Sequence, residues 1–133
     1  MILAFIPLTI NAILYKKVGG YDNTKIHGIL MSLSTLSAGF AFYVIYSNKA
    51  MNKRNHFTSL HGQSGGVILV LYLILAVVGF LGLHPDFGLL KTNKTVRAVH
   101  KYSGTYIIAY ILYVYIMYTC VYYRIYYYTV LHM

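Results

Sequence analysis

Three histidines, His27, His61 and His100, each stand near the start of a long apolar run, 34 and then 39 residues apart. An ionisable side chain in a membrane-spanning helix is costly, so each of these residues is a candidate for function. Haem iron that transfers electrons takes strong-field nitrogen ligands on both sides, and imidazoles from two facing helices supply them. The pattern therefore indicates haem ligation. Any one histidine near a helix end has a simpler alternative role, a hydrogen bond to headgroups or loop carbonyls.

The apolar residues that surround these histidines form blocks. The chain has 133 residues, of which 59% are hydrophobic and 10% are charged, against about 25% charged in a soluble domain. Three blocks run about 22 residues without a Lys, Arg, Asp or Glu, and about 20 such residues span the hydrocarbon of a bilayer as a helix. We predict an all-α integral membrane helix bundle that forms one domain over residues 1–133. Its expected elements are a partial N-terminal helix at 1–15 and full transmembrane helices at 24–47, 56–83 and 94–123.

The segments between the blocks are short, which predicts antiparallel neighbours and an up-down topology. Gly19 and Gly20 are expected to separate the first two helices, and Asp22 or Asn23 is expected to cap the start of the second. Thr92 or Asn93 is expected to cap the last helix. Pro7 is expected to interrupt the partial helix at 1–15.

The net charge of +9 does not predict nucleic-acid binding, because the basic residues lie between the apolar blocks, as in membrane proteins. Loops one and three share one side of the membrane and carry more basic residues than the other side. This bias predicts that loops one and three face the cytoplasm. The first group is Lys16, Lys17, Lys25, Lys91, Lys94, Arg97 and Lys101, and the second is Lys49, Lys53, Arg54 and Arg124.

Alternating spans place His27 and His100 at one face of the bilayer and His61 at the other. His27 and His100 are the pair expected at matching depth. Glycines follow His61 and His100 by one turn on the same helix face, at Gly65 and Gly104, and leave room for a flat macrocycle. No role is predicted for the three histidines outside the spans, although a substrate-side role stays open for the first of them. They are His56, His84 and His132.

Three motifs carry a family resemblance: Lys25-Ile26-His27-Gly28, the segment 55–63 (Asn-His-Phe-Thr-Ser-Leu-His-Gly-Gln), and the segment 97–104 (Arg-Ala-Val-His-Lys-Tyr-Ser-Gly). With them the chain resembles the cytochrome b561 family, and its small two-haem members most, over about residues 1–120. The resemblance implies two b haems, held by four histidines on helices two to five of a six-helix bundle. It also implies electron transfer from cytoplasmic ascorbate to monodehydroascorbate or a ferric chelate on the other side.

Carried to this chain, the resemblance makes His27 and His100 the axial iron ligands of the cytoplasmic haem, and His61 one ligand of the second. The neighbouring cations are expected to attract the ascorbate anion, or else simply to determine topology. They are Lys16, Lys17, Lys25 and Arg97. An endomembrane or plasma-membrane location and a homodimer are compatible with the sequence.

The first helix of the chain matches helix two of the family without its histidine, so the sequence completes one haem site rather than two. We expect a truncated form of a longer protein; a genuine short variant is the alternative. The competing functional hypothesis is a haem-free membrane scaffold or a fragment without independent activity. A transporter with histidine proton relays fits less well, because it requires histidines in the middle of the spans.

Overall fold

The computed structural model describes residues 2–131, apart from the side chains of residues 2–4, 118, 125, 129 and 131. The described part is helical, and three of its helices are long and apolar enough to cross a membrane. This confirms the predicted all-α membrane bundle with three full spans and one shorter N-terminal helix. The elements are α1 (Ile2–Val18), α2 (Tyr21–Met51), α3 (Leu60–Val77), the π-helix η1 (Val78–Gly82) and α4 (Lys94–Leu131).

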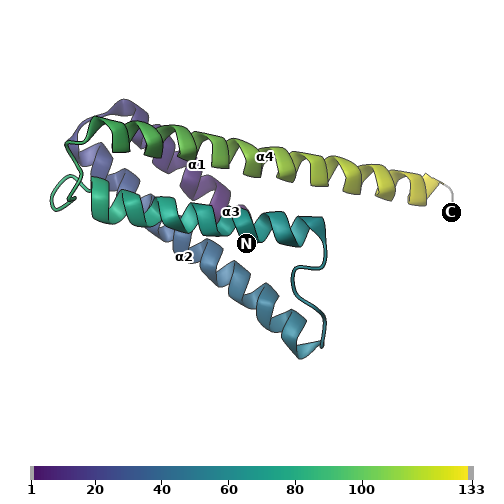
Figure 1. Cartoon of the computed structure of the whole chain (residues 1–133). Helices are drawn as coiled ribbons and strands as arrows, with labels where there is room; N and C mark the ends of the chain where they lie inside the picture. Colours follow the sequence, from purple (N-terminus) through teal and green to yellow (C-terminus); the bar gives the residue numbers. More distant parts are fainter. Residues whose placement is uncertain (1, 132–133) are drawn as a thin grey trace.

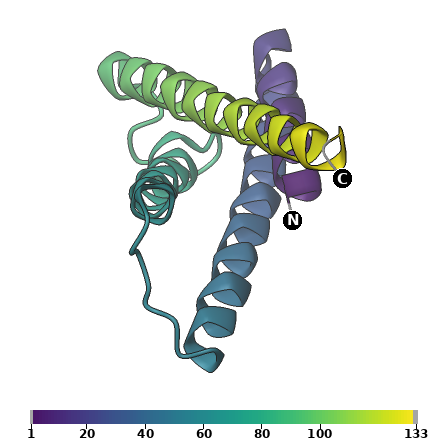
Figure 2. The ribbon, with the colours of Figure 1, turned by 90° about the vertical axis from the view of Figure 1, so that its right-hand side faces the viewer.

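Successive helices run in opposite directions, as the short loops predicted (Figure 1). The α1–α2 turn and the segment between η1 and α4 lie at one end of the bundle, and the α2–α3 loop lies at the other. Helix α1 packs most closely on α2. The second half of α2 diverges from α3, and the second half of α4 extends past the other helices (Figures 1 and 2). The bundle is therefore tightest at the end that carries the starts of α2 and α4.

The turn between α1 and α2 is shorter than predicted. Only Gly19 and Gly20 separate the helices, with φ angles of 80° and 90° that side chains other than glycine rarely adopt. The predicted side-chain cap at Asp22 or Asn23 is wrong, because Gly20 is the N-cap residue and no side chain caps α2. Asn23 Nδ2 instead donates to the Gly19 carbonyl at 2.7 Å. The glycine pair alone reverses the chain.

Other helix ends also differ from the predicted spans. Helix α1 continues through Pro7 to Val18, so the proline does not interrupt it. Helix α2 ends at Met51 rather than at 47, and α3 begins at Leu60 rather than at 56. Asn93 Oδ1 accepts the Val96 N–H at 3.1 Å, which confirms the asparagine cap of α4. Polar residues thus continue α1 and α2 beyond their apolar blocks, whereas the polar residues before Leu60 belong to the loop.

Tyrosine side chains line the projecting end of α4 and are more than half exposed. The helix has 38 residues and is about 57 Å long at 1.5 Å per residue, well beyond ~30 Å of hydrocarbon. Tyrosines concentrate where a span meets the headgroups. We therefore interpret this end of α4 as an interfacial anchor. The tyrosines are Tyr122, Tyr123, Tyr126, Tyr127 and Tyr128.

Three hydroxyl side chains from three helices meet in the interior. Thr9 of α1 is 2% exposed, Ser34 of α2 is 0% exposed and Tyr72 of α3 is 4% exposed. The Thr9 and Ser34 hydroxyls are 2.7 Å apart, and the Tyr72 hydroxyl donates to Ser34 Oγ at 3.2 Å. The Tyr72 ring also meets the Phe5 ring edge to face. Hydrogen bonds of this kind hold membrane helices together where lipid removes the hydrophobic driving force.

Replacing Ser34 by alanine is expected to destabilise the bundle, because it leaves the Thr9 and Tyr72 hydroxyls without their shared partner. The free energy of unfolding is expected to fall by about 0.6–1.7 kcal/mol, the range for interhelical hydrogen bonds in membranes. Denaturant unfolding in detergent measures it. Ser32→Ala is the matched control, because the Ser32 hydroxyl donates within its own helix, to the Gly28 carbonyl. An equal loss in both variants would contradict the interhelical role.

Candidate functional site

His27 and His100 lie at the same depth in the bundle. His27 follows the first residue of α2 by six residues, and His100 follows the first residue of α4 by six residues. Both helices start at the same end, so each ring lies about 9 Å along its axis from that end. The two imidazoles interact electrostatically with each other. The structure therefore brings together the two histidines that the sequence paired.

The His27 ring is held by α1. Its Nδ1 lies 2.9 Å from the carbonyl oxygen of Ala12, which is fully buried. A carbonyl oxygen only accepts, so Nδ1 carries the proton and donates. In a neutral ring this leaves the lone pair on Nε2. A hydrogen bond of this type orients an imidazole for metal ligation through its other nitrogen.

The His100 ring lies against the backbone of η1. A Cβ atom built on Gly79 would be 3.0 Å from His100 Cε1 and 3.5 Å from Nε2, so a side chain at this position would require the ring to move. His100 Nδ1 is buried and has no hydrogen-bond partner within the described part of the chain. Gly79 thus allows the ring to pack closely on η1, while one ring nitrogen has no hydrogen-bond partner among the described residues.

Gly79 is the site residue that the sequence interpretation missed. It stands in an apolar run beside other small and branched residues, and an isolated glycine in a helical pattern often has a packing reason. The end of η1 is closed by backbone bonds from the following segment to the Leu81 and Gly82 carbonyls, at 3.1 and 2.8 Å. Gly88 allows this fold-back, since a Cβ there would lie 2.5 Å from the His84 carbonyl oxygen.

His61 lies at the opposite end of the bundle. It is the second residue of α3, whose N-cap is Ser59, and it is exposed. The glycines one turn after His61 and His100 have open space beside them, since a Cβ at Gly65 or Gly104 would meet no atom within 4 Å. The structure therefore separates His61 from the other two histidines, and the sequence predicted this separation.

One of the four predicted ascorbate-binding cations, Lys16, lies beside the histidine pair, and a second, Arg97, lies near Lys16. Lys16 interacts electrostatically with both imidazoles and with Arg97. Its ammonium group donates to Thr24 Oγ1 at 2.7 Å, which holds the last turn of α1 against the start of α2. Lys17 is exposed. Lys16 therefore places a positive charge beside the pair, and Arg97 lies near Lys16.

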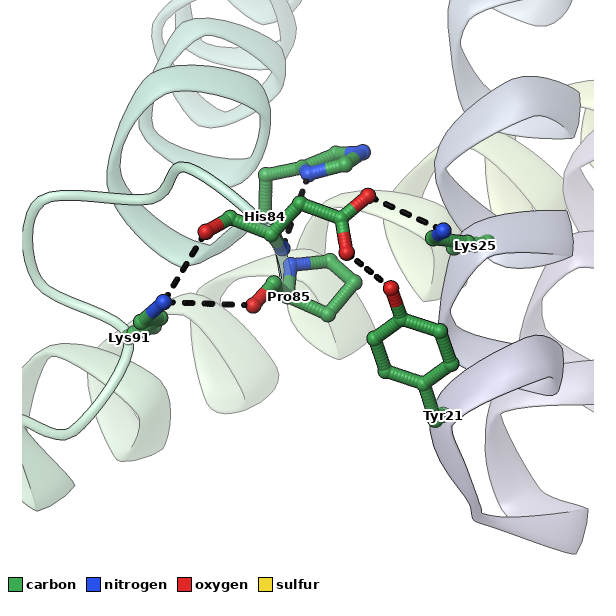
Figure 3. Close-up of polar contacts among 6 residues, drawn as sticks. Tyr21, Lys25, His84, Pro85 and Lys91 are labelled. Carbon is green, nitrogen blue, oxygen red and sulfur yellow. Dashed lines mark hydrogen bonds and ion pairs between the residues drawn. The ribbon is translucent and has the colours of Figure 1, made fainter.

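Lys25 is occupied by a different contact. Its ammonium nitrogen lies 3.0 Å from Asp86 Oδ2 and 4.4 Å from the centre of the Tyr21 ring. Asp86 also accepts a hydrogen bond from the Tyr21 hydroxyl, as Figure 3 shows. On the other side of the loop, the Lys91 ammonium donates to the Asp86 carbonyl at 2.9 Å. Asp86 therefore ties the segment before α4 to the start of α2 and offsets the charge of Lys25.

The histidines without a predicted role have packing contacts. The His56 ring stacks on Tyr46 and the His84 ring on Phe87, with the centres 4.0 Å apart in both pairs. His84 Nδ1 also accepts the Asp86 N–H at 3.2 Å. His132 lies outside the described residues.

Comparison with known proteins identifies the family. A family model described as eukaryotic cytochrome b561 matches residues 1–126. The chain belongs to the cytochrome b561 family. No curated protein and no solved structure matches the sequence. Cytochromes b561 bind haem b and carry electrons across membranes, so this cytochrome b561 is an integral membrane protein of electron transport.

Asp86 gives this cytochrome b561 a pH-dependent contact. The hydrogen bond from Tyr21 and then the contact with Lys25 hold the pKa of Asp86 below its ordinary value. A lowered native-state pKa means that the contact contributes stability above the ordinary value, near 3.9, and loses it as the pH falls through the lower native value. Amide hydrogen exchange corrected for intrinsic rates is expected to show residues 84–91 opening below about pH 4.

The same opening is expected at neutral pH in Asp86→Asn, because the amide cannot pair with Lys25. Asp22→Asn is the matched control, since it removes the other acid of the chain, which lies in the first turn of α2. Unchanged exchange at 84–91 in Asp86→Asn would show that Asp86 does not hold this segment.

Proposed function

We propose that the protein transfers single electrons from cytoplasmic ascorbate to monodehydroascorbate or ferric iron on the other side of the membrane. In this proposal His27 and His100 are the two axial ligands of one haem b. Family membership supports transmembrane electron transfer by haem. The observation that carries the finer proposal is the pair of interacting imidazoles at equal depth, with a cation beside them. The sequence motifs further favour the type called cytochrome b561 domain-containing protein 2.

The residues at the pair fit a haem b. The Ala12 carbonyl fixes the tautomer of His27 that has a lone pair on Nε2. His100 keeps a buried ring nitrogen without a hydrogen-bond partner among residues 2–131, and buried polar atoms are seldom left so. Two imidazoles are a strong-field donor set that suits iron in electron transfer. When bound, haem b supplies a one-electron couple between ferric and ferrous iron.

Lys16 and Arg97 are proposed to bind the ascorbate anion next to this haem. Lys16 interacts with both imidazoles and Arg97 interacts with Lys16, and no acid is paired with either cation in the described residues. Lys17 is assigned a weaker, long-range part because it is exposed. Lys25 contributes less than its charge suggests because Asp86 neutralises it. The excess of basic residues at this end favours the cytoplasmic side.

Replacing Lys16 or Arg97 by glutamine is expected to raise the KM for ascorbate about fivefold each, since a contact charge pair in water-like surroundings contributes about 1 kcal/mol. Steady-state ascorbate oxidation by the haem-loaded protein measures it. The wild-type KM is also expected to rise with salt, because screening weakens the attraction. Lys17→Gln is the matched control, because it removes the same single positive charge from an exposed position. If Lys17→Gln raised the KM as much as Lys16→Gln or Arg97→Gln, the proposed ascorbate site beside the haem would be refuted.

The test of the proposed function is a spectrum of the purified, haem-supplied protein, reduced by ascorbate and compared with its oxidised form. A low-spin b-type band that appears with ascorbate is the expected result. A well-folded sample without that band would instead favour a haem-free scaffold. A band that dithionite produces but ascorbate does not would support the haem and reject ascorbate as the donor.

His61 is proposed as one ligand of a second haem at the opposite end. Its support is the sequence motif at residues 55–63 and its place at the start of α3, on the side away from His27 and His100. Replacing His61 by alanine leaves the residues around the His27–His100 pair untouched, so the first haem does not depend on it.

A further inference from the structure

A hollow of about 300 Å³ lies at the C-terminal end of α2, away from the histidine pair. One of the five residues that line the hollow, Ile45, is apolar, and the other four carry amide or cationic groups. The lining residues are Ile45, Asn48, Lys49, Asn52 and Arg54. Four of its five lining residues are exposed, so the hollow is an open site at the surface.

The backbone at the end of α2 fixes where the two lining cations emerge. The Arg54 N–H donates to the Lys49 carbonyl at 2.9 Å, and the Lys53 N–H donates to the Ala50 carbonyl at 3.1 Å. Lys53 takes a left-handed conformation with φ of 50°, which completes a Schellman motif. Lys49 and Arg54 both line the hollow, and Lys53, between them in the sequence, is not part of its lining.

The rest of the α2–α3 loop is anchored as well, which keeps Arg54 near α2. His56 stacks on Tyr46 of α2 with the ring planes 14° apart. Phe57 stacks on Phe42 and fills the space beside Gly66 of α3, where a Cβ would come within 2.8 Å of its ring. The Asn52 amide also donates to Asn48 Oδ1 at 2.6 Å, which fixes the two amides. The loop that carries Arg54 is therefore anchored to both α2 and α3.

The charge at this end of the chain has no acidic counterpart. The two acids of the sequence, Asp22 and Asp86, both lie at the opposite end, in the first turn of α2 and in the segment before α4. Lys49 follows the start of α2 by about 42 Å at 1.5 Å per residue, a distance comparable with a bilayer that includes its headgroups. The cations of the hollow thus lie at headgroup depth.

We propose that this hollow binds a phosphate group, with Lys49 and Arg54 as its charged partners. A guanidinium and an ammonium beside amide groups are donors suited to an oxyanion. Ile45, one turn deeper in the span, suits the apolar part of a membrane lipid, so the source of the phosphate is a lipid headgroup or a free anion. This site is independent of haem and of the proposed electron transfer.

The test uses the full chain in detergent micelles with two probes. Phosphatidic acid retention is followed by native mass spectrometry, and inorganic phosphate binding by titration calorimetry. Lys49→Gln and Arg54→Gln are each expected to weaken binding about fivefold, as for one contact charge pair. Lys53→Gln removes the same charge from the same loop and is expected to change binding less than twofold.

The two probes separate the sources of phosphate. A selective loss with phosphatidic acid alone supports a lipid headgroup site, and a selective loss with inorganic phosphate as well supports a site for the free anion. Equal losses in Lys53→Gln, or no loss in either lining variant, would show only diffuse charge attraction and overturn the proposal. Circular dichroism confirms that each variant stays helical.

Discussion

His100→Ala is expected to remove the low-spin b-type absorbance of the haem-supplied protein while its helices stay folded, and His27→Ala is expected to do the same. The two rings lie on separate helices at equal depth, so neither replaces the other. Loss of a residue that only supports a metal ligand weakens metal binding about 10–100-fold, and loss of the ligand itself is expected to exceed about 100-fold. The reduced-minus-oxidised spectrum and the haem-to-protein ratio measure it.

His84→Ala is the control for this prediction, because His84 packs on Phe87 outside the pair. It is expected to keep the band. Helical circular dichroism of every variant separates haem loss from unfolding. Wild-type haem content in both His27→Ala and His100→Ala would refute the pairing, and loss in only one of them would place the second ligand elsewhere.

The membrane spans were predictable because an apolar run in lipid has few alternatives to a helix, whose backbone bonds are all internal. The depth of His27 and His100 followed from the same runs. The helix ends were less predictable, since the absence of charge marks the hydrocarbon and not the helix. Lys49 and Met51 continue α2 beyond the apolar block because nothing there breaks the helix before the turn at Lys53.

The contacts that surround the pair depend on tertiary packing and were not predictable from spacing. Lys25 and Asp86 are far apart in the sequence and meet only because the start of α2 and the segment before α4 share one end of the bundle. The same is true of Thr9, Ser34 and Tyr72, which look like ordinary polar interruptions of three separate apolar runs. Hydropathy locates the helices, whereas these polar contacts set how the helices are positioned.

The packing of η1 on His100 leads to a second prediction with a large effect. Gly79→Val is expected to reduce haem retention about 10–100-fold, the cost of losing a group that orients a metal ligand. A Cβ at Gly79 already comes within 3.0 Å of the ring, and the two methyl groups of valine add further overlap. Gly79→Ala is expected to have a smaller effect, because the ring then needs to move by only a few tenths of an ångström.

Gly82→Ala is the matched control for Gly79→Ala, because it adds the same methyl group to the same π-helix. The nearest atoms to a Cβ at Gly82 are side-chain atoms of Leu90 and Val78 at 3.9 Å, which is ordinary contact. Haem content and the redox midpoint potential are therefore expected to shift in Gly79→Ala and to stay at the wild-type values in Gly82→Ala. Both substitutions change helix propensity alike, so this comparison isolates the contact with His100. Equal behaviour of the two alanine variants would mean that Gly79 does not position the ring.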